Sequence, residues 1–146
     1  DNGGVAQIVA FRSYLRDIDP GLTAAIAELR SEVGLDQPGG WERMTPEDRA
    51  AYQTRLRALR AEYPDATVAD MADHIDHAVA VAGIDHVGIV SDFDGGGGVR
   101  GWDDASETPN VTAELLRRGY SEEDIAKLWG GNVLRVMRGV EAAAVR

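Results

Sequence analysis

Apolar residues recur along the chain with two different periods, which predict strands in two places and helices elsewhere. Residues 5–11 (VAQIVAF) and 86–93 (HVGIVSDF) are short, mostly apolar runs, typical of strands buried on both faces of a parallel sheet. Between and after them, apolar residues return every three or four positions, as in amphipathic helices. The order strand, helices, strand, helices favours an α/β fold with a parallel sheet. Two strands cannot bury so many helices, so the remaining strands are either missing from this chain or supplied by a partner.

Residues typical of helix N-termini predict where several of the helices begin. Asp19 and Pro20 offer an N-cap followed by a proline in the first turn. The segments 45–48 (TPED) and 67–70 (TVAD) each have Thr followed three residues later by Asp, which is the spacing of a capping box. Asn132 follows two glycines, and we expect it to cap a last helix. Glycines after several of the apolar stripes predict the helix ends.

Composition and charge exclude several classes of function. The 146 residues suit one domain, and no apolar run approaches the ~18 residues of a membrane span. A net charge of −10 argues against nucleic acid and anionic membrane surfaces as partners. There is no cysteine, which excludes disulfides, thiolate metal sites and cysteine nucleophiles. Because this composition fits a reducing compartment and the first residues lack a signal-peptide pattern, we expect a cytoplasmic protein.

Acidic residues follow the second predicted strand, in the stretch GIVSDFDGGGG at 88–98. In parallel α/β folds, sites form at the carboxyl ends of the strands, where Asp92 is expected. A carboxylate there can bind a metal, take a proton from water or pair with an ammonium group. The glycines permit tight turns and close backbone approach to a ligand. The structural alternative, favoured more for Asp94 than for Asp92, is a carboxylate that only caps a turn.

Two chemical interpretations of this stretch arise from its spacing alone. A phosphatase of the haloacid dehalogenase type would use Asp92 as nucleophile and Asp94 as acid, but its motif follows the first strand and has Thr where this chain has Gly96. A calcium loop would use the same two carboxylates. Gly96 offers it no side-chain ligand, and a strand precedes the loop where a helix is expected.

A third interpretation comes from a resemblance that spans nearly the whole chain. The segments 73–98 (DHIDHAVAVAGIDHVGIVSDFDGGGG) and 114–137 (ELLRRGYSEEDIAKLWGGNVLRVM) closely resemble the membrane (renal) dipeptidase family, zinc metallopeptidases of the amidohydrolase type. The match is weakest in the arginine-rich middle of the chain, which we interpret as a variable insertion. The resemblance implies a (β/α)8 TIM barrel, a single domain of which residues 1–146 are the C-terminal part. Residues 5–11 and 86–93 would be its last two strands.

The resemblance also implies a reaction and its residues. These enzymes hydrolyse dipeptides with two zinc ions bridged by a hydroxide, and their metal ligands are expected upstream of residue 1. This segment alone should therefore be inactive. Asp92 matches the family residue that binds the substrate amino group and handles the proton of the bridging hydroxide, and Tyr14 matches an aromatic substrate contact. Val90 stands where the family usually has Gly, which narrows the floor of the pocket. His74 and His77 match the family pattern without being ligands, and we expect structural roles for them.

The implied partners are a dipeptide substrate and the upstream segment of the barrel, without nucleic acid or a membrane segment. Trp102, Asp103, Asp104 and Glu107 follow the second strand. They could line the substrate mouth or a homodimer contact, and a solvated loop is slightly favoured. A non-catalytic remnant or assembly module of the same fold is the alternative to an enzyme.

Overall fold

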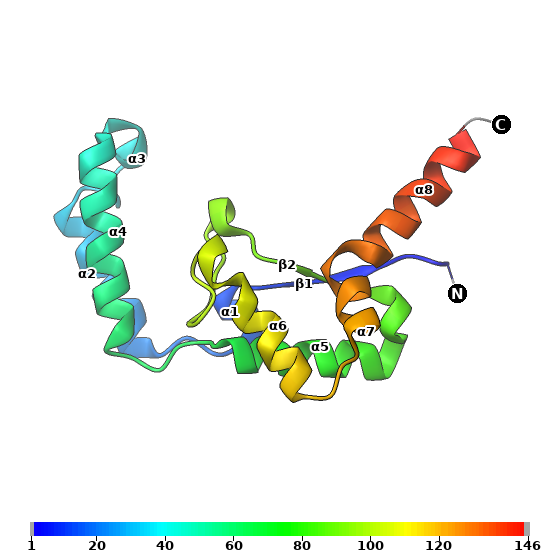
Figure 1. The fold of residues 1–146 in the computed structure, drawn as a ribbon. Helices are drawn as coiled ribbons and strands as arrows, with labels where there is room; N and C mark the ends of the chain where they lie inside the picture. The colour runs from blue at the N-terminus through cyan, green and yellow to red at the C-terminus, as the bar shows by residue number, and fades with distance from the viewer. Residues whose placement is uncertain (1, 145–146) are drawn as a thin grey trace. The chain divides into compact units, whose positions relative to one another are not determined.

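The computed structural model describes residues 2–144, and the chain divides into two compact units (Figure 1). Unit 1 comprises Asp1–Arg16 and Ala66–Arg146, and unit 2 comprises Asp17–Asp65. Unit 2 coincides with the arginine-rich middle of the chain. Within residues 2–144, every helix is too short or too polar to cross a lipid bilayer.

Unit 1 contains a two-stranded parallel sheet. Strand β1 (Ala6–Val9) pairs with β2 (Val87–Val90), in a register that runs from Ala6 opposite Val87 to Val9 opposite Val90. Both strands are shorter than the apolar runs that predicted them. The expected α/β organisation with parallel strands is confirmed, because helices separate the two strands along the chain.

The helices of unit 1 lie between and after the two strands along the chain. They are α1 (Arg12–Leu15), α5 (Val68–Ala82), α6 (Thr108–Arg117), α7 (Glu122–Ala126) and α8 (Asn132–Ala144). The predicted capping box of α5 is present, because the Thr67 hydroxyl accepts from the Asp70 amide and the Asp70 carboxylate accepts from the Thr67 amide. Gly83 ends α5 with a φ of 86°, which favours glycine. Helix α7 leads into α8 through Lys127–Gly131, where Gly130 has non-helical φ and ψ of 169° and −17°, so the chain kinks at the glycine pair as expected.

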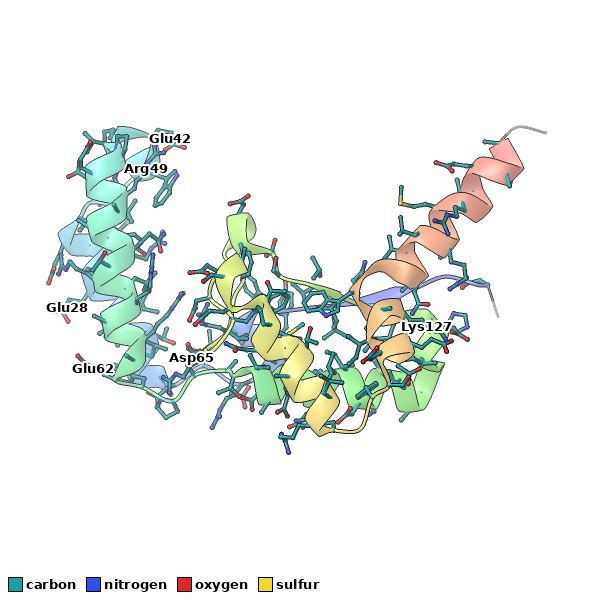
Figure 2. All side chains as sticks on the ribbon, viewed as in Figure 1. Glu28, Glu42, Arg49, Glu62, Asp65 and Lys127 are labelled. Carbon is teal, nitrogen blue, oxygen red and sulfur yellow. The ribbon has the colours of Figure 1, made fainter. Side chains whose placement is uncertain are left out.

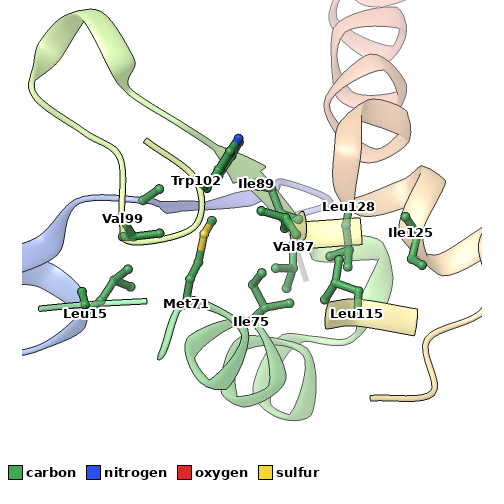
Figure 3. Packing of buried hydrophobic residues seen from close by; sticks show 13 residues of the cluster. Leu15, Met71, Ile75, Val87, Ile89, Val99, Trp102, Leu115, Ile125 and Leu128 are labelled. Carbon is green, nitrogen blue, oxygen red and sulfur yellow. The ribbon is translucent and has the colours of Figure 1, made fainter. Parts of the chain in front are cut away.

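The hydrophobic core lies on one face of the sheet. Val87 and Ile89 of β2 pack there with Ile75 of α5 and Leu115 of α6 (Figure 3). Alternate side chains of a strand point to opposite faces. The other face, which we call the open face, therefore carries Gln7, Val9, Gly88 and Val90. Gln7 and Val90 are exposed on it. A Cβ atom at Gly88 would lie 2.1 Å from Gln7 Oε1, so the Gln7 side chain lies across this glycine.

Asn132 has a different role from the predicted helix cap. Its φ and ψ of −67° and −43° are helical, whereas a capping residue is not, so the prediction is wrong. The side chain is buried, and its Nδ2 donates to the carbonyl oxygens of Ile84 at 2.7 Å and Val87 at 2.8 Å. Asn132 thus ties the start of α8 to the start of β2.

Lys127, the single lysine of the chain, forms ion pairs near the same end of β2. Figure 2 labels Lys127, which lies between α7 and α8. Its ammonium lies 3.1 Å from the carboxylate of Asp85 and 3.4 Å from that of Glu123. Both carboxylates raise the pKa of Lys127, with the hydrogen bond to Asp85 as the largest cause. The amino end of β2 is therefore held by structural contacts.

Unit 2 is a helical unit with its own small core. Its helices are α2 (Pro20–Glu32), α3 (Gly40–Arg43) and α4 (Pro46–Ala61). Leu29, Leu35, Tyr52 and Leu56 are buried between them. The predicted caps are confirmed: the Asp19 side chain accepts from two amides of α2, and the residues at 45–48 form a capping box.

Candidate functional site

Asp92 lies two residues after β2, in a strained backbone conformation. Its φ and ψ are 56° and 33°, and among residues 2–144 no other non-glycine residue has a positive φ. The left-handed region costs an L-residue about 1–2 kcal/mol, although Asp and Asn tolerate it better than most. Such strain is concentrated at functional sites, where the surrounding structure holds it. The backbone therefore supports the choice of Asp92 as the candidate residue.

The glycines after Asp92 allow the chain to fold back onto it. The amides of Gly95 and Gly97 donate to the Asp92 carbonyl oxygen at 3.0 and 2.7 Å. A Cβ atom at Gly95 would lie 2.2 Å from Asp92 Oδ1, and one at Gly97 would lie 2.1 Å from the Ser91 carbonyl oxygen. The contact at Gly97 is with backbone and is not compatible with a side chain, whereas the Asp92 carboxylate could turn away from a side chain at position 95. Glycine at position 97 is thus required by the close approach of the loop to Asp92, whereas Asp94 lies exposed in the single turn Phe93–Gly95.

Tyr14 follows the neighbouring strand at the same end of the sheet. It belongs to α1, directly after β1, and its side chain is 69% exposed. Its ring centre lies 4.8 Å from that of Phe11. Phe11 pairs with Gly98 of the glycine run, and the Gly98 amide donates to the Ala10 carbonyl oxygen at 2.7 Å. The segments that carry Tyr14 and Asp92 are therefore joined at the carboxyl ends of the two strands.

A salt bridge links the same two segments further along the chain. The guanidinium of Arg12, the first residue of α1, contacts the carboxylate of Asp103. The Arg12 side chain is only 11% exposed and that of Asp103 is 41% exposed. The amide of Asp103 donates to Glu107 Oε2 at 2.7 Å, so its backbone is held as well. The sequence pattern did not indicate this pair, because 91 positions separate the two residues.

Trp102 is buried, so the favoured prediction that it lies in a solvated loop is wrong. It is 2% exposed, and its ring meets those of Phe93 and Trp129 edge to face, with centres 5.5 Å apart in each pair. Its Nε1 donates to Thr108 Oγ1 at 3.0 Å. The adjacent Asp103 and Asp104 are exposed. The loop after β2 is therefore anchored in the core through an aromatic side chain.

Two of the histidines contact backbone oxygens. His74 Nε2 lies 3.1 Å from the Leu15 carbonyl oxygen, and His86 Nδ1 lies 2.8 Å from that of Gly4. His77 is exposed on α5. Within residues 2–144, no three His, Asp or Glu side chains converge closely enough to hold a metal ion. The described residues therefore do not form a metal centre by themselves.

Asp76, within the HIDH segment, contacts the RRGY segment across the helices. Its carboxylate accepts from Arg118 at 2.5 Å and from the Tyr120 hydroxyl at 2.7 Å. Arg118 also contacts Glu114 at 2.7 Å, and the hydrogen bonds from Arg117 and Arg118 lower the pKa of Glu114 to about 2. Burial and the hydrogen bond to Asp76 raise the pKa of Tyr120. These residues join α5 to α6, which is a structural role.

Comparison with known proteins places the chain among dipeptidases. The family model described as membrane dipeptidase, peptidase family M19, matches residues 1–146. Dipeptidase ataJ of Aspergillus terreus is 49% identical over 87 residues, which are 59% of this chain and 21% of that protein. Dipeptidase 3 of Rattus norvegicus is 43% identical over 77 residues, which are 52% of this chain and 16% of that protein.

A solved structure is similar over more of the chain. The crystal structure of the probable dipeptidase PvdM from Pseudomonas aeruginosa shares 44% sequence identity with a TM-score of 0.63, and the match covers 92% of this chain and 36% of that one. This chain therefore spans well under half the length of each of these proteins.

Proposed function

The chain belongs to the membrane dipeptidase family, peptidase family M19, and on that premise we propose that the complete protein hydrolyses dipeptides. The observation that carries the proposal is the placement of Asp92. Its strained backbone is held at the carboxyl end of a parallel strand, which is the end where α/β folds of the barrel type build their sites.

Asp92 is proposed to bind the amino group of the dipeptide and to transfer the proton of the attacking water. Its carboxylate binds the ammonium group of the dipeptide, which orients the scissile carbonyl. It takes a proton from the attacking water as the water oxygen bonds to the carbonyl carbon. The same proton then passes to the leaving nitrogen as the C–N bond breaks. One carboxylate can serve both steps because it ends the reaction in the protonation state in which it began.

The proposed reaction also uses zinc, whose ligands we expect outside this chain. When bound, zinc ions would polarise the scissile carbonyl and lower the pKa of the attacking water. The described residues do not form a metal centre by themselves. We therefore assign the ligands of the two zinc ions to the part of the protein outside this chain.

Two further residues are proposed to shape the substrate site. Tyr14 is exposed beside the end of β1 and offers an aromatic face and a hydroxyl to the substrate. Val90 lies on the open face, two residues before Asp92, and is 36% exposed. Its branched side chain would reduce the depth of the site below Asp92.

The two strands are proposed to belong to a (β/α)8 barrel. The support is that β1 and β2 are parallel, that their core lies on one face and that Gln7 and Val90 are exposed on the other. In such a barrel the open face would point inward, and further strands would pair with both edges.

The experiment compares an unblocked alanine dipeptide with its N-acetyl derivative as substrates of the complete protein. Acetylation removes the ammonium group that the Asp92 carboxylate is proposed to bind. It should therefore lower kcat/KM by at least about a hundredfold, the scale expected for a lost charge-assisted contact. Equal hydrolysis of both would contradict the role of Asp92. Hydrolysis of neither would favour a non-catalytic protein of the same fold.

A further inference from the structure

We infer that Arg12 is a positioning residue, whose salt bridge with Asp103 fixes the loop that presents Asp92. This inference rests on the proposed function only for its effect on turnover. The site loop, as we name residues 91–104, leaves β2 and contains four consecutive glycines. Glycine lowers the cost of its turns but increases the conformational freedom that folding must restrict.

Three further contacts hold the site loop in addition to the buried ring of Trp102. Gly98 is hydrogen-bonded to Ala10 at the end of β1, at 2.7 Å. Arg100 exchanges backbone hydrogen bonds with Ala66 at 2.9 Å and Val68 at 3.2 Å. Asp103 is held through its side chain by Arg12. The salt bridge therefore joins the far end of the loop to α1, next to the buried Trp102 and beside the hydrogen bond from the Asp103 amide to Glu107.

Arg12 connects the two segments that carry the candidate substrate contacts, Tyr14 and Asp92. It lies on the same short helix as Tyr14, and α1 is itself fixed by the contact between the Leu15 carbonyl oxygen and His74. Because the guanidinium is largely buried, solvent screens this pair less than an exposed one. Loss of the salt bridge should increase the mobility of the site loop relative to α1 and leave the carboxylate of Asp92 chemically unchanged.

The experiment removes the salt bridge from the complete polypeptide with the variants Arg12→Gln, Asp103→Asn and the two together. A matched control, Arg55→Gln, breaks the pair between Arg55 and Glu32 in unit 2, whose side chains are 52% and 51% exposed. Two properties are measured: amide hydrogen exchange at residues 95–102, and kcat and KM on a dipeptide. Asp103→Asn, at the more exposed position, provides the test if Arg12→Gln does not fold.

We expect each single variant to speed exchange in the site loop and to lower kcat about tenfold, because small displacements of a reacting group reduce turnover strongly. KM should change far less, and the double variant should lose no more than either single one, because both remove the same contact. The control should change neither property. Unchanged exchange in Asp103→Asn overturns the inference whether or not the protein is active. Faster exchange with wild-type kcat overturns the positioning role.

An inactive wild-type protein would count against the proposed function alone. In that case the exchange rates still decide whether Arg12 fixes the loop. The two proposals can therefore fail separately.

Discussion

The amide of Gly97 donates to the carbonyl oxygen of Asp92 at 2.7 Å, and a Cβ atom at position 97 would lie 2.7 Å from the Cβ atom of Asp92. The hydrogen bond and the missing side chain belong together, because only glycine can approach so closely. The conformation of the candidate catalytic residue therefore depends on a residue five positions later.

Gly97→Ala should disturb the site more than the fold. The new methyl group would meet the Ser91 carbonyl oxygen at 2.1 Å, so the loop must move, at a cost of about 1–3 kcal/mol in the free energy of unfolding. Turnover by the complete protein should fall at least about tenfold, because Asp92 moves with the loop. Urea unfolding and dipeptide kinetics measure the two effects.

Gly139→Ala is the matched control for that change. Gly139 lies in α8, and apart from its chain neighbours and the nearby backbone of its own helix no described atom lies within 4 Å of the Cβ position. Alanine should stabilise this helix by up to about 1 kcal/mol and leave turnover unchanged. Equal effects of the two substitutions would show that the close approach at position 97 is unimportant.

Asp92→Gly should separate stability from activity. Glycine adopts a φ of 56° without strain, so the free energy of unfolding should stay the same or rise by up to about 1 kcal/mol. Turnover should disappear because the carboxylate is gone. Asp92→Ala keeps the strain and loses the carboxylate, so it should be less stable than the glycine variant. The reverse order of stability would mean that the backbone at this position is not strained.

Asn132→Ala should destabilise unit 1. It removes both hydrogen bonds to the carbonyl oxygens of Ile84 and Val87 at a site where Asn132 is 3% exposed. Losing these partners should cost about 2–4 kcal/mol. Asn110→Ala is the control, because Asn110 donates to Gly101 at an exposed site and should cost less than about 1 kcal/mol. Similar losses in the two variants would contradict the account of α8.

The contacts of Glu114 should make part of the stability depend on pH. Hydrogen bonds from Arg117 and Arg118 lower its pKa from its ordinary value of 4.5 to about 2. A lowered folded-state pKa adds stability above the unfolded-state value, and this stability is lost as the pH falls towards the folded-state value. The difference in free energy of unfolding between wild type and Glu114→Gln should therefore be largest near neutral pH and narrow as the pH falls from 4.5 to about 2. A difference that stays constant over this range would exclude the contribution.

Features determined by neighbouring residues could be predicted from the sequence. The capping boxes at 45–48 and 67–70 are present because Thr and Asp three residues apart satisfy each other's backbone partners. The parallel pairing of the strands was also predicted, because apolar runs separated by helices leave few other arrangements. The position of the acidic loop at the carboxyl end of β2 predicts the candidate site, and its function remains a prediction.

Features that depend on contacts between distant positions could not be predicted. The polar neighbours of Trp102 predict a solvated loop, whereas the ring of Trp102 packs against Phe93 and Trp129 in the structure. The glycine pair before Asn132 predicts a cap, and only the position of β2 reveals the actual partners of Asn132, 45 and 48 residues away. The salt bridge between Arg12 and Asp103 has no local signal at all. The roles of Asp92 and Tyr14 in binding and catalysis remain predictions.

The turnover number of Asp92→Asn in the complete protein, measured together with its zinc content, tests the central claim most directly. Asparagine tolerates the left-handed backbone and preserves the size of the side chain, while it removes the charge and the ability to accept a proton and replaces one oxygen by an NH2 donor. The account predicts that kcat for an unblocked dipeptide falls by at least about a hundredfold, the usual scale of acid–base catalysis, while the zinc content stays at the wild-type level. A kcat close to that of the wild type would contradict it.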